Sequence, residues 1–205
     1  MKRPALFSIF LLLALCLFPA IGRAQPTILV FGDSLSAGYG IPRESGWVSL
    51  LQQQLQHTHP QYQVVNASIS GETTSGGRWR FEPALLQHRP AIVILELGAN
   101  DGLRGAAIAD IRSNLSYMLR LAHKANSKVL LLGMQLPPNY GIDYSKQFKA
   151  LYPQLAQRYH TALVPFLLAG VAPQQFQADN LHPDAEAQPL LLHNVLRRLE
   201  PLLEK

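Results

Sequence analysis

Hydroxyl, carboxylate, imidazole and amide groups stand in four short segments of the chain, and each segment follows an apolar run. Ser34 comes first, Gly71 and Asn100 follow two later runs, and Asp179 and His182 lie near the carboxyl end. A serine hydroxyl attacks a carbonyl carbon when an imidazole removes its proton and a carboxylate orients that imidazole. These residue types therefore indicate acyl transfer with a serine nucleophile.

His182 differs from the other histidines because Asp179 precedes it by three residues. This spacing can fold the carboxylate back onto the imidazole within one turn of chain. The carboxylate would then accept a hydrogen bond from Nδ1–H and leave Nε2 free to take the proton of Ser34. An Asp-x-x-His pair is common by chance, so it gains meaning only together with Ser34. We predict Ser34 as the nucleophile, His182 as the base and Asp179 as the residue that orients the base.

Three hydrogen-bond donors are available for the oxyanion that such a reaction forms. They are the backbone N–H groups of Ser34 and Gly71 and the side-chain amide of Asn100. Each has an ordinary explanation by itself, because Ser caps helices and Gly and Asn form turns. Their order, one after each of three apolar runs, favours the catalytic interpretation. A metal site is not predicted, because no acidic residues converge on His57 and His59.

These residues need a scaffold that brings the ends of separate runs together. Apolar runs rich in Val, Ile and Leu alternate with amphipathic stretches, which is typical of strands and helices in a parallel α/β protein. The carboxyl ends of parallel strands meet at one edge of a sheet, where ligands bind in this class. The predicted fold class is therefore α/β, with a mainly parallel sheet in a three-layer α/β/α arrangement. Its five strands are predicted at residues 27–31, 62–66, 91–97, 128–134 and 162–165.

The amino-terminal residues differ from the rest of the chain. A short basic start precedes an apolar run at residues 5–20, and small residues follow at positions 22 and 24. This pattern predicts a secretory signal peptide at residues 1–24, followed by a hydrolase domain at residues 25–205. A membrane anchor is the alternative, but the run is short for a span, which needs roughly 20 apolar residues.

The single cysteine, Cys16, lies in the same segment, so the mature chain would hold no disulfide. A lipid anchor at Cys16 is disfavoured because Leu15 stands where a small residue would be expected. Cleavage would remove three basic residues and no acidic one, which lowers the net charge from +5 to +2. The remaining charges are dispersed and do not indicate nucleic-acid binding. We expect a periplasmic or secreted monomer with no stable membrane anchor.

Four blocks of the sequence resemble the SGNH (GDSL-like) hydrolase family: Gly32-Asp33-Ser34-Leu35-Ser36, Gly71, Gly98-Ala99-Asn100-Asp101 and Asp179-x-x-His182-Pro183. The longer runs 65–71, 96–105 and 136–141 are similar to its branch of periplasmic acyl-CoA thioesterases, also described as lysophospholipases, arylesterases and proteases. The resemblance covers nearly the whole mature chain. It implies a flavodoxin-like fold, a single catalytic domain, no cofactor, and an oxyanion hole built from Ser34, Gly71 and Asn100.

The same resemblance places an acyl groove between two loops, at residues 102–106 and 137–142. By analogy, the substrate-binding residues would be Leu103, Pro138, Tyr140 and Ile142. The alternative is that these loops only pack on the sheet, and the sequence does not decide between the two.

The function predicted from these observations is hydrolysis of carboxylic esters and thioesters through an acyl-enzyme on Ser34. The expected substrates are small acyl esters, acyl thioesters or lysophospholipids. A carbohydrate O-acetylesterase of the same family is the alternative, but the apolar side chains of the two loops favour an acyl chain over a sugar. A binding module without catalysis would be expected to lack Ser34 or His182, and both are present.

Overall fold

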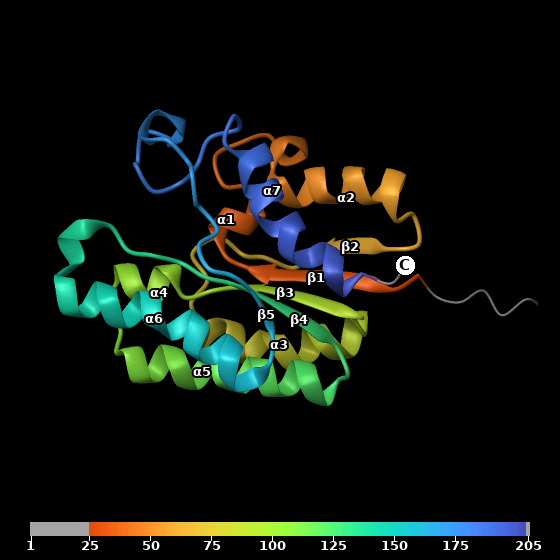
Figure 1. Cartoon of the computed structure of the whole chain (residues 1–205), viewed down its shortest axis with the longest axis horizontal. Helices are drawn as coiled ribbons and strands as arrows, with labels where there is room; N and C mark the ends of the chain where they lie inside the picture. The colour runs from red at the N-terminus through yellow and green to blue at the C-terminus, as the bar shows by residue number, and fades with distance from the viewer. Residues whose placement is uncertain (1–24, 204–205) are drawn as a thin grey trace, which may run out of the picture.

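The computed structural model describes residues 25–203, so the predicted signal peptide lies outside the described residues. The described part is built on one five-stranded sheet whose order is β2-β1-β3-β4-β5 (Figure 1). All neighbouring strands are parallel, so the sheet is fully rather than mainly parallel. The strands are β1 (Thr27–Gly32), β2 (Gln63–Asn66), β3 (Ile92–Glu96), β4 (Lys128–Leu132) and β5 (Ala162–Val164).

The predicted apolar runs extend past the ends of several strands. Tyr62, Leu97 and Met134 belong to these runs but lie outside the strands, and all three are buried. The difference arises because an apolar run reports burial, whereas a strand also requires hydrogen bonds to a neighbouring strand. The runs therefore locate the strands correctly and overestimate their lengths.

Two layers of helices cover the sheet (Figure 1). One face carries α2 (Trp47–Thr58) and α7 (Gln188–Leu199), which pack against each other. The opposite face carries α3 (Thr74–His88), α5 (Ile108–Lys124) and α6 (Ile142–Tyr159). Pro189 is the second residue of α7, as expected for a residue that lacks a backbone N–H. The arrangement confirms the predicted three-layer α/β/α fold.

Short helices occupy the connections at the carboxyl edge of the sheet. The helix α1 (Ser34–Ala37) follows β1, and α4 (Ala99–Leu103) follows β3. Further connections contain the 3₁₀ helices η1 (Arg43–Ser45), η2 (Pro138–Tyr140) and η3 (Pro173–Gln175). A fourth, η4 (Glu200–Leu202), follows α7 at the opposite edge, where its Leu202 carbonyl accepts from Lys128 at the start of β4.

The strand order determines where a site can form. The chain passes from β1 outward to β2 and then returns across β1 to β3, so the connections leave β1 and β3 in opposite directions. A crevice is expected at such a switch point. The residues of β3 are all buried, and β1 is buried apart from its first residue. The two strands at the switch point therefore lie in the core of the sheet.

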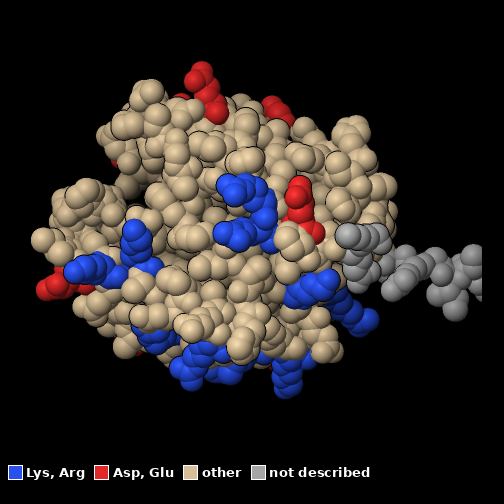
Figure 2. Space-filling view, in the orientation of Figure 1, with Lys and Arg blue, Asp and Glu red and all other residues tan. Residues whose placement is uncertain are grey.

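The surface gives two further facts. On the face shown in Figure 2, Lys and Arg side chains gather over α5 and α6, and acidic side chains lie mainly toward the opposite edge. Among residues 25–203, the helices are all too short or too polar to cross a bilayer.

Candidate active site

The hydroxyl of Ser34 lies at the point where β1 gives way to α1. Asp33 caps this helix by accepting a hydrogen bond from the Leu35 N–H at 3.0 Å. Ser34 is largely buried, and its Oγ lies 2.8 Å from Nε2 of His182. The predicted nucleophile and base are therefore in hydrogen-bond contact although 148 positions separate them.

Asp179 completes the series through the other nitrogen of the imidazole. Its Oδ2 lies 2.6 Å from Nδ1 of His182, and its Oδ1 accepts the backbone N–H groups of Leu181 and His182. These hydrogen bonds, led by that of the His182 backbone, lower the pKa of Asp179 to about 2. The carboxylate is thus ionised at neutral pH and accepts from Nδ1–H, which leaves Nε2 as the acceptor for the Ser34 hydroxyl.

Two residues that the sequence analysis did not single out support the His182 loop. The ring of Tyr39 packs against the imidazole with 4.6 Å between ring centroids. The backbone N–H of Gln177 donates to the His182 carbonyl at 2.8 Å, and its side-chain amide donates to the Tyr39 carbonyl at 2.8 Å. The loop is therefore tied to the segment after α1. No sequence motif marks these residues, because they act through contacts between distant segments.

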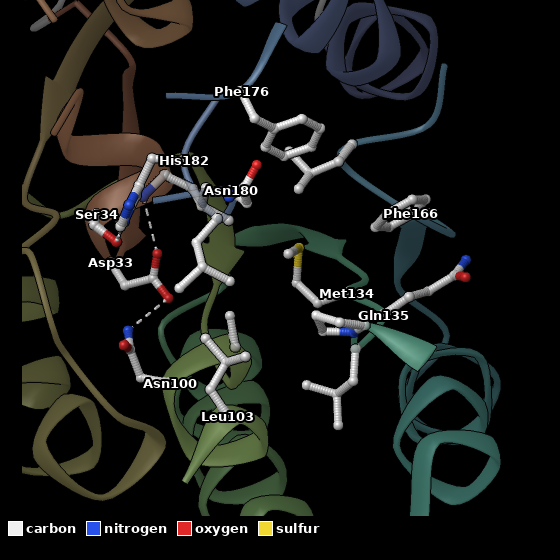
Figure 3. Close-up of a pocket in the computed structure, with 16 residues that line it drawn as sticks. Asp33, Ser34, Asn100, Leu103, Met134, Gln135, Phe166, Phe176, Asn180 and His182 are labelled. Atoms are coloured by element: carbon white, nitrogen blue, oxygen red, sulfur yellow. Dashed lines mark hydrogen bonds between the residues drawn. The ribbon is translucent and has the colours of Figure 1, made fainter. Parts of the chain in front are cut away.

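Asn100 reaches the same place from α4 (Figure 3). Its Nδ2 donates to Oδ2 of Asp33 at 3.1 Å and to the backbone carbonyl of Glu72 at 3.0 Å. Both hydrogens of the amide are therefore engaged within the protein, one of them beside Ser34.

Gly71 lies on the exposed turn after β2, where its φ of 79° favours glycine. The next residue, Glu72, pairs with Arg80 at 2.5 Å, which fixes the end of the turn on α3. Within the described part of the chain, the N–H groups of Ser34 and Gly71 have no assigned hydrogen-bond acceptor. Their roles as oxyanion donors stay predictions.

A pocket of about 300 Å³ opens beside Ser34 and His182 (Figure 3). Leu103, one of the predicted substrate-binding residues, lines it together with Leu136 and Pro137, and its role in binding stays a prediction. Pro138, Tyr140 and Ile142 are not among the residues that line it, and Ile142 is 79% exposed at the start of α6. Their assignment to substrate binding stays a prediction without support from the pocket.

Most of the remaining wall comes from residues that the sequence analysis missed. They lie after β4 and β5 and in the loop before His182: Met134, Gln135, Phe166, Leu168, Phe176, Asn180 and Leu181. The position of these segments after predicted strands could have indicated them, since loops at the carboxyl edge line sites in this fold. The outline of the molecule is indented between the loop after β5 and the segment around η2 (Figure 2).

A second carboxyl group lies beneath the site. Glu96 ends β3 and is fully buried, and its Oε2 accepts the Asp33 N–H at 3.1 Å and the Ser36 hydroxyl at 2.8 Å. Burial raises the pKa of Asp33 to about 6, and burial together with the charge of Asp33 raises the pKa of Glu96 well above its usual range. The sequence showed the signal, which is one acidic residue at the end of an otherwise apolar strand.

A Ser–His–Asp series at the carboxyl edge of a parallel sheet, in a three-layer α/β/α fold, defines a serine hydrolase. Comparison with known proteins agrees with this class, because residues 30–189 match the GDSL-like lipase/acylhydrolase family. The chain belongs to this family and is an ester hydrolase.

Three similar proteins show how far the likeness extends. The chain is 50% identical to esterase TesA of Pseudomonas aeruginosa over 93% of its length and 96% of the relative's. It is 41% identical to thioesterase 1/protease 1/lysophospholipase L1 of Escherichia coli K12, over 95% of its length and 92% of the relative's. A crystal structure of TesA superposes with a TM-score of 0.84 at 50% identity and covers 86% of this chain and 99% of that chain.

Proposed function

We propose that this chain hydrolyses carboxylic esters and acyl thioesters through a covalent acyl-enzyme on Ser34. The observation that carries the proposal is the continuous hydrogen-bonded series from Ser34 Oγ through His182 to Asp179, at 2.8 and 2.6 Å. This geometry lets a neutral imidazole accept the hydroxyl proton as the oxygen attacks. The names of the similar proteins, which include esterase and thioesterase, support the same reaction class.

The reaction would proceed in two halves. In the first half, Ser34 Oγ bonds to the acyl carbon and its proton passes to His182 Nε2. The imidazolium then gives that proton to the leaving alcohol or thiolate as the bond to the acyl carbon breaks. In the second half, water attacks the acyl carbon and His182 accepts its proton. The imidazolium then gives that proton to Ser34 Oγ as the bond between Oγ and the acyl carbon breaks, which releases the free acid.

The negative charge that develops on the carbonyl oxygen needs donors in both halves. The Asn100 amide and the N–H groups of Ser34 and Gly71 are the donors we assign to it. Asn100 would reach the oxyanion by giving up its contact with the Glu72 carbonyl. One donor of this kind typically contributes about 100- to 1,000-fold to the rate.

The pocket supports an acyl chain rather than a sugar as the bound group. Its wall is mostly hydrophobic, with Leu, Met, Pro and Phe side chains, and beyond the residues around Ser34 only Gln135 and Asn180 add polar side chains. A sugar would need several hydrogen-bond partners, because its hydroxyl groups lose their hydration on binding. An O-acetylesterase acting on carbohydrate is therefore the less favoured function.

A substrate panel tests the reaction and the bound group together. Purified protein would be assayed with p-nitrophenyl esters from acetate to decanoate and with matched acyl-CoA thioesters. We expect kcat/KM to rise with acyl length over several methylene groups, because each buried methylene contributes about 0.8 kcal/mol. A preference for acetate, with activity on acetylated oligosaccharides, would favour the O-acetylesterase instead.

Covalent labelling tests the nucleophile. A fluorophosphonate probe should label the wild-type protein once, and Ser34→Ala should remove both the label and the activity. Ser49→Ala is the matched control, because Ser49 lies on α2 outside this pocket. Persistent labelling of Ser34→Ala would assign the nucleophile to another residue.

We also propose that residues 1–24 direct export and that residues 25–205 form the catalytic domain. The basic start, the apolar run and the small residues at positions 22 and 24 support this proposal. Amino-terminal sequencing of the protein recovered from the periplasm or medium should read Gln-Pro-Thr. A mature protein that retains residue 1 would contradict it. We expect size-exclusion chromatography to show a monomer.

A further inference from the structure

The carboxyl group of Glu96 has no role in the mechanism described above, although it lies directly beneath the nucleophile turn. It is fully buried, and its Oε2 accepts two hydrogen bonds, from the Asp33 N–H and the Ser36 hydroxyl. The Glu96 and Asp33 carboxyl groups also lie within reach of each other, and this contact lowers the pKa of Asp33 and raises that of Glu96. The backbone leaves room for this arrangement, because a Cβ at Gly32 would lie 2.6 Å from Oε2.

The contact between two buried carboxyl groups determines where a proton must be. Two buried carboxylates that interact directly cannot both be charged without a large electrostatic cost. Oε2 of Glu96 already accepts two donors, whereas Oε1 is buried and has no hydrogen-bond partner among residues 25–203. A proton on the Glu96 carboxyl would make Glu96 the donor and Asp33 the acceptor.

The surrounding groups favour the same assignment. Asp33 accepts one hydrogen bond on each carboxylate oxygen, from the Leu35 N–H and from the Asn100 amide, and these donors favour its ionised state. Tyr152 on α6 and Asp101 on α4 are the other titratable groups near the pair, and Tyr152 donates its hydroxyl hydrogen to the Leu97 carbonyl. These groups leave Glu96 as the member of the pair that holds the proton.

The contacts of Asp33 connect this pair to the reaction. Its Oδ2 accepts from Asn100 Nδ2, and its Oδ1 accepts from the Leu35 N–H that begins the nucleophile helix. Any shift of the Asp33 carboxylate would therefore move the Asn100 amide and the turn that carries Ser34. Oxyanion donors lose effect when they are displaced by a fraction of an ångström, so the support of Asp33 bears on the rate.

We propose that Glu96 is a positioning residue whose protonated carboxyl donates a hydrogen bond to Asp33 and thereby holds the Asn100 amide in place for the oxyanion. This inference rests on the proposed function, since it assigns Asn100 to the oxyanion. It differs from a purely structural role for Glu96, which would affect stability and leave kcat unchanged.

Steady-state kinetics of two substitutions test the proposal. Glu96→Gln keeps a neutral side chain with one acceptor and an N–H donor, so kcat should stay within about threefold of wild type. Glu96→Leu removes the donor, so kcat should fall by about tenfold or more while KM changes by less than about twofold. Ser127→Ala is the control, because Ser127 is buried at the opposite end of the sheet and bonds the Pro90 carbonyl. It should lose stability without losing kcat.

Infrared spectroscopy provides a readout that does not depend on activity. The wild-type protein at neutral pH should show the carbonyl stretch of a protonated carboxylic acid, and Glu96→Gln should lack that band. The same comparison decides the question if Glu96→Leu does not fold. Fluorophosphonate labelling of Ser34 in every variant shows whether the acyl-enzyme mechanism itself holds.

Three results would overturn the role of Glu96. They are an unchanged kcat in folded Glu96→Leu, an equal loss of kcat in Glu96→Gln and Glu96→Leu, or a wild-type spectrum without the acid band. Absence of labelling at Ser34 in the wild-type protein would instead refute the proposed function.

Discussion

The imidazole of His182 is oriented by two different kinds of contact. Asp179 holds Nδ1 through a short hydrogen bond, and the Tyr39 ring packs against the imidazole face. A carboxylate also stabilises the positive charge that forms on the ring, whereas a packed tyrosine mainly restricts its rotation. The two contacts therefore restrain the same ring in different ways.

Substitution of Asp179 should be less damaging than substitution of His182. We expect Asp179→Ala to retain more kcat than His182→Ala, because Tyr39 still restricts the ring. The double variant Tyr39→Ala/Asp179→Ala should lose more than the product of the two single losses, since both restraints are then absent. Single-turnover kinetics with a p-nitrophenyl ester measures each rate. Simple multiplication of the two losses would show that the contacts act independently.

Asn100 should contribute to the rate far more than to the fold. Asn100→Ala removes a proposed oxyanion donor, so we expect kcat to fall about 100- to 1,000-fold. The loss of its two hydrogen bonds should lower the free energy of unfolding by only about 1–3 kcal/mol. Kinetics and urea unfolding measure the two effects, with the exposed Asn139→Ala as control. Near wild-type turnover in folded Asn100→Ala would exclude the assignment.

At the scale of elements, the strands were predictable and the pocket wall was only partly so. Continuous apolar patterns located β1, β3 and β4, whereas β2 and β5 are only partly buried and followed from the alternation of strands with helices. The wall instead comes from loops after β4 and β5, where Phe166 and Phe176 meet Leu103 from α4. No local sequence pattern specifies that these side chains line one pocket, because this depends on how three connections pack around the edge of the sheet. Leu103 was found through its place in a family motif.

If the pocket holds the acyl chain as proposed, a larger side chain at Leu103 should change the substrate preference. Leu103→Trp should fill part of the pocket and lower kcat/KM for p-nitrophenyl octanoate by about tenfold or more, because several methylene groups lose their contacts. Hydrolysis of the acetate should change by less than about threefold. The matched control is Ile142→Trp, since Ile142 is exposed outside the pocket lining. A larger effect of Ile142→Trp would place the acyl chain along the loop before α6.

For the whole molecule, the pH dependence of stability reflects two carboxyl groups with opposite shifts. The pKa of Asp33 is raised to about 6, so its contribution to stability is complete below 3.8 and is lost as the pH rises through 6. The pKa of Asp179 is lowered to about 2, so its contribution is present above 3.8 and is lost as the pH falls through 2. Above pH 6 the buried Asp33 carboxyl is charged, and this charge lowers the free energy of unfolding.

Asp33→Asn should show how much the charge of Asp33 lowers the free energy of unfolding. The substitution removes the buried charge and keeps a residue that caps helices well. Relative to wild type, its free energy of unfolding should be higher at pH 7.5 than at pH 4, with a difference of up to about 3 kcal/mol. Urea unfolding at the two pH values measures it. The same relative stability at both values would show that Asp33 is not charged at pH 7.5.

The fold and the proposed reacting residues were predicted from the sequence, whereas the residues that support them were not. Five alternating repeats specified the sheet, and motifs at strand ends located Ser34, Asn100 and His182. Glu96, Tyr39 and Gln177 act through hydrogen bonds across 60 to 138 positions or through packing, and no spacing rule encodes such contacts. Their roles depend on three-dimensional proximity, which a single sequence does not record.

The hydrogen bond between the Asn100 amide and the Glu72 carbonyl competes with any hydrogen bond from that amide to a bound substrate. A neutral ester carbonyl that takes the amide hydrogen exchanges one uncharged acceptor for another, so the ground state gains little. An oxyanion accepts a charge-assisted hydrogen bond that is roughly twice as strong, so in the proposed mechanism it displaces the Glu72 carbonyl from the Asn100 amide. An internal competitor of this kind directs the binding energy of the donor toward the transition state, which is the only place where it accelerates the reaction.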